Sequence, residues 1–479
     1  MNASSVPIML NLVALVVAFF SGELADANLQ GALVTLFLLV IGNIVWIGIL
    51  SKQRGGGPAC FGFFLFFVLL FYGFRGMTFM MAGDSELMTQ IGVSHPDIWL
   101  SKALWMVTVF VSAGSLVYGL ALGWSEEIVP VWITRFIAKY RPLSLLRDDA
   151  RTSPGLLIGL ALAWSAAAVV TVLVVRKGSV EGLFNIILPT VFGLVMFAYI
   201  MIAYRRDGSV DWRMLLGCAA AAIGISMFAR DAFSTRMWAF GILALLLISV
   251  LHYFRVYLVG MMAVVLALPV IQLFGENRYV KSDDFFENLS TQIAEKRERG
   301  MADFVLGPYA IESGDFTALD LFSAVLHNGQ EFRPWGLSFL YPFVHWVPRQ
   351  MWESKPEEGI LTDEESFRLA NTPYGLRMIP YDPGIVGTLY LEGGKAFVVL
   401  LGAVAGLLAV FFDTLLARLA SEPSFARFGR LLFTIGFFCC FYAARARPYQ
   451  VMYLAGFMIV GILLAGRIHQ ACLANAERS

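Results

Sequence analysis

The chain has 479 residues, with 35 lysines and arginines balanced by 35 aspartates and glutamates. Apolar residues make up 58% of it and its mean hydropathy is +0.71, whereas soluble domains contain roughly 45 to 50% apolar residues. This composition excludes an ordinary soluble domain and predicts an all-α protein that crosses a membrane many times.

Apolar runs of about 17 to 25 residues, long enough to cross a bilayer, recur along the whole chain. The sequence predicts about twelve such spans. Nine lie near 6–22, 31–50, 59–80, 102–123, 155–175, 184–203, 213–228, 237–252 and 256–274. Three more lie near 396–416, 431–445 and 450–466. The first run is expected to remain as an uncleaved helix, because no lysine or arginine precedes it and further spans follow.

The positions of lysine and arginine predict the orientation, because these residues in short loops resist transfer across the membrane. With both ends of the chain in the cytoplasm, the short cytoplasmic loops carry most of these cations and the opposite loops carry far fewer. Residues 1–274 then hold spans one to nine, and residues 396–479 hold spans ten to twelve with a cytoplasmic tail. Residues 275–395 form one large outer segment between spans nine and ten.

Nucleotide and metal chemistry find little support in the motifs. Gly55-Gly56-Gly57 lacks the lysine and the following helix of a phosphate-binding loop. The five histidines are scattered, with no pair at the spacing that would place two imidazoles on one metal ion. Carboxylates alone could still hold a hard cation. We therefore expect no cofactor and assign no metal ligand.

The outer segment begins with two helical patterns. Residues 284–299 place apolar side chains on one side and a dense run of charges on the other, which is typical of a solvated surface helix. Residues 315–327 repeat an apolar face, and Gly329 is expected to end that helix. Residues 333–356 are rich in tryptophan, tyrosine and phenylalanine, which suit the membrane boundary.

Arginines gather on the predicted outer surface, against the usual tendency for cations to lie inside. A guanidinium group is planar, always charged and able to bind phosphate through two hydrogen bonds. A single arginine is more often explained by a nearby acid or by its position at the membrane surface, but a cluster favours a lipid-borne pyrophosphate. The candidate pyrophosphate-binding residues are Arg230, Arg236, Arg333, Arg349, Arg377 and Arg445.

Two stretches of the outer segment resemble the O-antigen or oligosaccharide repeat-unit polymerases of bacterial envelopes, the Wzy type. The first is GDFTALDLFSAVLHNGQEFRPWGLSFLYPFVHWVPRQMWESKP and the second is YDPGIVGTLYLEGGKAFVVLLGAVAGLL. The matching positions are Gly336, Ser338, Phe339, Pro348, Arg349, Trp352, Lys355 and Pro356, then Pro383, Gly387, Tyr390 and Gly394. The resemblance covers roughly residues 315–410. Thr388 stands where members often carry an acid, and Asp382 or Glu392 would take its place.

The resemblance implies a GT-C-like glycosyltransferase in the bacterial inner membrane with its active site facing the periplasm. Its donor and acceptor would both be undecaprenyl-pyrophosphate-linked oligosaccharides, its other partners membrane lipids, and nucleic acid would not be among them. Whether a chain-length regulator binds is left open. The arginines would neutralise the leaving pyrophosphate. A base near the acceptor hydroxyl would come from His345, Asp382 or Glu392.

Three other classes stay open. An O-antigen ligase would use the same donor but transfer the glycan to the lipid A core. A secondary transporter or flippase of lipid-linked sugars would also suit about twelve spans, although it predicts repeated halves and charges at mid-membrane. A scaffold without chemistry would explain the hydrophobicity but not the concentration of arginines.

Overall fold

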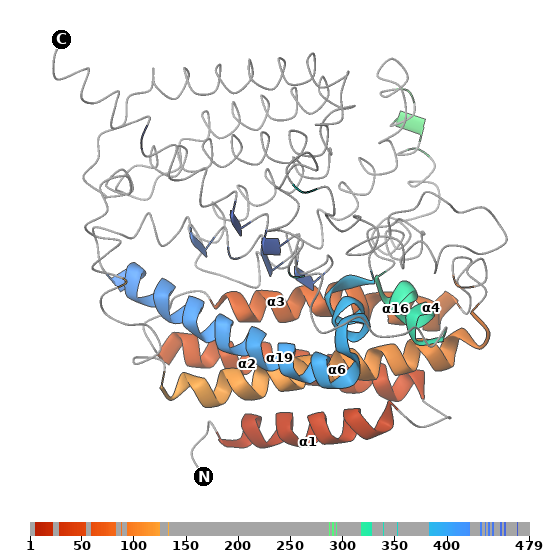
Figure 1. Ribbon diagram of the computed structural model, residues 1–479, viewed down its shortest axis with the longest axis horizontal. Helices are drawn as coiled ribbons and strands as arrows, with labels where there is room; N and C mark the ends of the chain where they lie inside the picture. The colour runs from red at the N-terminus through yellow and green to blue at the C-terminus, as the bar shows by residue number, and fades with distance from the viewer. Residues whose placement is uncertain are drawn as a thin grey trace. The chain divides into compact units, whose positions relative to one another are not determined.

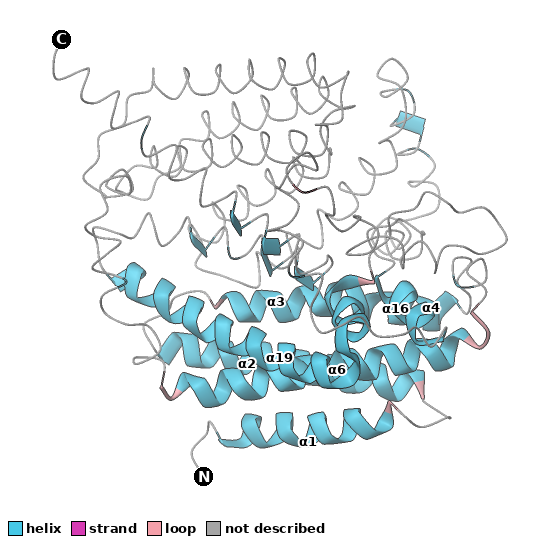
Figure 2. Cartoon of the chain, viewed as in Figure 1, coloured by secondary structure: helices cyan, strands magenta, loops and turns pink. Residues whose placement is uncertain are grey.

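The structure is a computed structural model, and it describes six continuous stretches of the chain. They are residues 5–22, 28–53, 59–82, 93–124, 318–327 and 383–421. It also describes residues 88, 133, 287, 290–291, 294, 339, 352, 432–433, 436, 439–440, 443–444, 451–452, 455–456 and 467. Within this described part, every regular element is a helix (Figure 2).

The continuous stretches form the helices labelled in Figure 1. They are α1 (Ser5–Ser21), α2 (Leu29–Gln53), α3 (Cys60–Val68), the π-helical turn η1 (Leu69–Gly73), α4 (Phe74–Ala82), α6 (Pro96–Leu122), α16 (Ala318–His327) and α19 (Gly384–Ser421). Among the described residues, four helices are long and apolar enough to cross a membrane: Leu29–Gln53, Cys60–Met81, Pro96–Leu122 and Gly384–Leu419. These four match predicted spans two, three, four and ten.

The outward face of α2 shows the character of a membrane helix. Leu33, Leu36 and Val40 are buried against neighbouring helices. The opposite side carries apolar residues as well, including Leu38 at 69% exposure and Val45 at 56%. A helix at the surface of a soluble domain would place polar residues there. The chain is therefore a membrane protein, with α2 at the edge of the helix bundle.

Helix α6 lies at the centre of these helices, buried along most of its length, and it contacts α1, α2 and α16. Its closest approach to α19 depends on glycines. A Cβ atom added to Gly402 would lie 2.7 Å from the carbonyl oxygen of Phe110, and one added to Gly406 would collide with the backbone of Gly114. Small residues four apart allow membrane helices to pack backbone against backbone.

Two polar contacts hold helices together away from the later site. The Asn11 and Asn43 side chains exchange hydrogen bonds of 2.8 and 3.0 Å between α1 and α2. In α19, the Asp413 carboxylate accepts hydrogen bonds from the backbone N–H of Cys60 at 2.7 Å and from the Tyr118 hydroxyl at 3.1 Å. Residue Ala59 cannot cap α3 with its own side chain, so Asp413 caps that helix from α19.

The start of α19 differs from the predicted span. We expect span ten to begin near residue 396, but the helix begins at Gly384. It is interrupted at Gly393 and Gly394, where Gly394 has a φ of 65°. Such a φ is readily adopted only by glycine. The first nine residues therefore form a separate short helix, residues 384–392, inside the predicted outer segment, and the long helix follows from residue 395.

The helix predicted for residues 315–327 is confirmed as α16. Of the predicted surface helix at 284–299, the structure describes Glu287, Ser290, Thr291 and Ala294, which are helical and exposed. Predicted spans five to nine, residues 155–274, lie outside the described residues. Isolated residues of spans eleven and twelve are described, and all of them are helical.

Candidate functional site

Glu392 is the predicted site residue that the structure describes. The other catalytic candidates, His345 and Asp382, lie outside the described residues. So do the predicted pyrophosphate-binding residues Arg230, Arg236, Arg333, Arg349, Arg377 and Arg445. The candidate site is therefore built around Glu392 and the helices that hold it.

Glu392 is the last residue of the short helix 384–392, immediately before the two-glycine break. Its side chain is completely buried. Thr388 lies one turn earlier on the same face, and its buried hydroxyl oxygen makes no hydrogen bond within the described part of the chain. A carboxyl group taken out of water is costly unless its surroundings compensate for it. A fully buried acid beside a helix break, in the stretch that resembles the polymerases, is a candidate functional group.

The short helix is held by glycines that allow close contact. Gly384 has a φ of 66°, and a side chain there would collide with the Tyr72 hydroxyl and lie 3.1 Å from the Cβ of Ala318. A Cβ at Gly387 would lie 3.1 Å from Phe322. The rings of Phe322 and Tyr390 are 5.8 Å apart. Gly387 and Tyr390, both positions of the polymerase-like pattern, therefore pack the short helix against α16.

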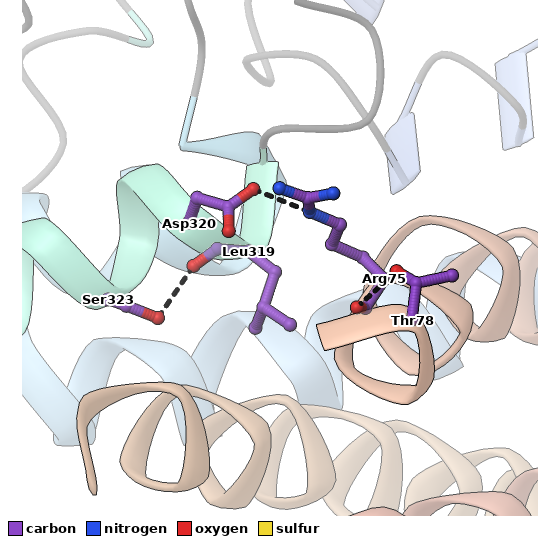
Figure 3. A network of polar contacts seen from close by, with 5 residues as sticks. All are labelled: Arg75, Thr78, Leu319, Asp320 and Ser323. Atoms are coloured by element: carbon purple, nitrogen blue, oxygen red, sulfur yellow. Dashed lines mark hydrogen bonds and ion pairs between the residues drawn. The ribbon is translucent and has the colours of Figure 1, made fainter. Parts of the chain in front are cut away.

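Helix α16 is in turn joined to α4 by a buried ion pair. The Nε of Arg75 lies 2.8 Å from Oδ2 of Asp320, and the two side chains are 5% and 0% exposed. Figure 3 shows the Arg75 side chain extended toward Asp320. Thr78 and Ser323 instead bond to the backbone of their own helices, at Arg75 and Leu319 (Figure 3). The other oxygen of Asp320, Oδ1, is buried and has no hydrogen-bond partner in the described part of the chain.

Burial raises the pKa of Asp320 above its ordinary value, because a charged carboxylate loses its hydration inside the protein. The neighbouring Arg75 guanidinium acts in the opposite direction and lowers that pKa, but burial has the larger effect. The ion pair therefore costs desolvation free energy, which the contact between Arg75 and Asp320 offsets in part.

The far end of α16 makes a second polar contact. His327 Nε2 lies 3.1 Å from the hydroxyl oxygen of Ser94, just before α6. The rings of His327 and Trp99 are 5.3 Å apart, edge to face. Lys102 lies over the Trp99 ring at 4.4 Å. Asp320 and His327 are seven residues apart, which places them on the same side of the helix. Helix α16 is thus held near both of its ends.

These contacts all lie at one end of the helices, which we call the α16 end. It contains the last turns of α4, the start of α6, α16 and the short helix 384–392 (Figure 1). Asp413 and the start of α3 lie at the opposite end of the same helices. Among the described residues, no group of three or more histidine, cysteine, aspartate or glutamate side chains could hold a metal ion. The α16 end contains two buried carboxyl groups, Asp320 on α16 and Glu392 on the short helix.

Sequence reasoning found Glu392 through the polymerase-like pattern but missed Arg75 and Asp320. A signal was present, because Arg75 lies inside predicted span three and Asp320 inside a largely apolar helix. Charged residues in apolar segments usually face a partner or a cavity. The pairing of two residues so far apart in the chain was not readable from either segment alone.

Comparisons of the chain with protein-family models, curated proteins and solved structures give no match.

Proposed function

We propose that the protein polymerises undecaprenyl-pyrophosphate-linked oligosaccharide repeat units into O-antigen or exopolysaccharide. In this reaction the growing glycan leaves its lipid pyrophosphate carrier and joins the terminal sugar of a new lipid-linked repeat unit. The glycosyl pyrophosphate bond is already activated, so the reaction needs no nucleotide.

One observation carries the proposal most directly. Glu392 is a fully buried carboxyl group at a glycine break before a membrane-length helix. It lies within the stretch of sequence that resembles the repeat-unit polymerases. Ionisable residues within apolar, membrane-length helices are commonly functional. The break places this group at the end of a membrane helix, where a lipid-linked substrate would present its first sugars.

The chemistry requires two kinds of group. A base accepts the proton of the acceptor hydroxyl while that oxygen bonds to the anomeric carbon of the donor sugar. The bond from that carbon to the pyrophosphate oxygen breaks, and the leaving lipid pyrophosphate takes the electron pair. Glu392 is the described candidate for the base, beside His345 and Asp382. The predicted arginines would stabilise the negative charge that develops on the leaving group.

The proposed function also sets the topology. We place the α16 end at the periplasmic face of the bacterial inner membrane and Asp413 near the cytoplasmic face. The full chain would have about twelve spans in a GT-C-like arrangement. This orientation puts the short helix 384–392 and α16 on the side where lipid-linked repeat units are assembled.

The test is a reconstituted reaction. The full-length protein in lipid nanodiscs is incubated with synthetic undecaprenyl-pyrophosphate repeat units, without nucleotide. We expect a ladder of longer lipid-linked products, separated by one repeat unit each. If the products form only when lipid A core is supplied, each core receiving the donor's glycan with no lengthening of the lipid-linked chain, the protein is a ligase. Absence of any glycosyl transfer contradicts an enzymatic role.

A further inference from the structure

We propose that Arg75 and Asp320 are positioning residues for the proposed glycosyl transfer, acting together through α16 to fix the location of Glu392. This inference rests on the proposed function and concerns a pair of residues that the polymerase-like pattern does not explain. Neither residue needs to touch the substrate. Their contribution is the register of α16, and through it the register of the short helix that ends at Glu392.

An unbroken series of contacts leads from the ion pair to Glu392. Arg75 on α4 binds Asp320 at 2.8 Å. Two residues farther along α16, the Phe322 ring packs on Tyr390 at 5.8 Å. Tyr390 precedes Glu392 by two residues in the short helix. A shift of α16 along or around its axis would therefore move the helix that carries Glu392.

The fit between α16 and the short helix leaves little room for adjustment. The Cβ positions at Gly384 and Gly387 lie 3.1 Å from Ala318 and Phe322 of α16. At such distances, even a methyl group would force its neighbours apart. Packed interfaces of this kind shift between discrete arrangements rather than deform smoothly. A displacement of α16 would therefore displace the short helix as well, because the interface between them cannot adjust.

A buried ion pair is an inefficient way to stabilise a fold. Its desolvation cost offsets much of its Coulombic gain, and apolar residues of similar volume are often as stabilising or more so. Asp320 keeps one buried oxygen without a hydrogen-bond partner in the described part of the chain, which adds to that cost. In some proteins a buried polar or ionic group fixes a single register, and this is the role proposed for Arg75 and Asp320.

The position of Arg75 just after a π-helical turn also suits a positioning role. Arg75 lies two residues after the π-helical turn η1, which interrupts the regular helix between α3 and α4. An inserted π-helical turn changes the direction in which the following side chains point, and such turns occur often at functional sites. The turn also carries Tyr72, whose hydroxyl faces Gly384. The same short segment thus contacts both α16 and the start of α19.

The experiment compares variants in the same reconstituted polymerisation assay, with rates expressed per folded molecule. We expect Asp320→Asn to lower kcat by about 10- to 100-fold, because a displacement of about 1 Å can cost that much, while KM changes by less than about threefold. Arg75→Gln should act likewise, and the double variant should be no slower than the more affected single variant. The charge-exchanged variant Arg75→Asp with Asp320→Arg should recover at least part of the lost kcat.

The matched control is Asn43→Leu, which breaks a separate buried polar pair, between α1 and α2. It should lower thermal stability yet leave kcat per folded molecule within about twofold, because Asn43 bonds to Asn11 of α1 rather than to α16 or the short helix. If the charge-exchanged variant does not fold, kcat per folded molecule of the single variants and of this control still tests the inference. An Asp320→Asn variant with wild-type kcat per folded molecule overturns the inference while the ladder from the wild type leaves the proposed function standing. A wild type that forms no ladder overturns both.

Discussion

At the scale of single residues, Asp413 is a polar group that stabilises the fold. Its carboxylate accepts hydrogen bonds from Tyr118 and from the first backbone N–H groups of α3. Those N–H groups have no partner within their own helix. Asp413 therefore does for α3 what a capping side chain normally does, but from a different helix.

Replacing Asp413 by alanine should destabilise the protein without affecting transfer. The change leaves buried donors unpaired, which costs about 1 to 3 kcal/mol. Thermal unfolding in detergent should show a lower Tm, whereas kcat per folded molecule should stay near the wild-type value. Asp97→Ala, at an exposed position in the first turn of α6, is the control and should change Tm little. A large loss of kcat with an unchanged Tm would show that Asp413 acts in the reaction.

Glu392 and Asp320 show the contrasting case. Both are completely buried carboxyl groups at the α16 end, and neither caps a helix in the contacts described. Asp320 forms an ion pair with Arg75, whereas Glu392 is distinguished by the glycine break that follows it. The two acids differ in their proposed tasks, one holding a helix in place and the other accepting a proton.

At the scale of elements, the crossing of α6 and α19 decides whether the long helix after the break is held in register. Gly402 and Gly406 let the two backbones approach at Gly114. Along α19 this contact lies between the break at Gly394 and Asp413. It holds α19 close to α6 beyond the break at Gly394.

Substituting Gly406 by alanine should therefore be costly. The added Cβ would meet the backbone of Gly114, which cannot move aside as a flexible side chain can, so we expect a loss of about 1 to 3 kcal/mol from overpacking. Gly48→Ala in α2 is the matched control, because nothing lies within 4 Å of a Cβ there. It should be neutral or slightly stabilising, since alanine favours a helix over glycine. Equal Tm values for the two variants would contradict the close approach of α6 and α19.

The elements also show how far sequence reasoning reaches. Spans two, three, four and ten and the helix at α16 follow from apolar runs and periodicity, which are properties of each segment alone. The helical character of residues 384–392 was not predicted, because glycines interrupt this short apolar run and it lies in the predicted outer segment. Only the contacts of Gly384 and Gly387 with α16 and Tyr72 explain why a helix forms there. The Arg75–Asp320 pair was likewise out of reach, since it joins segments 245 residues apart.

At the scale of the whole molecule, the proposed function depends on the orientation of the α16 end. Single cysteines can test it in a background without the five native cysteines. Asp97 is exposed at the start of α6, and Gln53 is exposed at the end of α2. We expect a membrane-impermeant maleimide to label Asp97→Cys in intact spheroplasts and to label Gln53→Cys only after the membrane is permeabilised. The reverse pattern would place the α16 end in the cytoplasm and contradict the proposed site.

The most direct test of the central claim is the rate of repeat-unit addition by Glu392→Gln in the reconstituted assay without nucleotide. The amide keeps the shape of the side chain but cannot accept the proton of the acceptor hydroxyl. General base catalysis contributes about 10²- to 10⁴-fold, so we predict a loss of that size, with Glu287→Gln at an exposed position retaining the wild-type ladder. A Glu392→Gln protein that forms the ladder at the wild-type rate would contradict the claim that this buried carboxyl group takes part in the reaction.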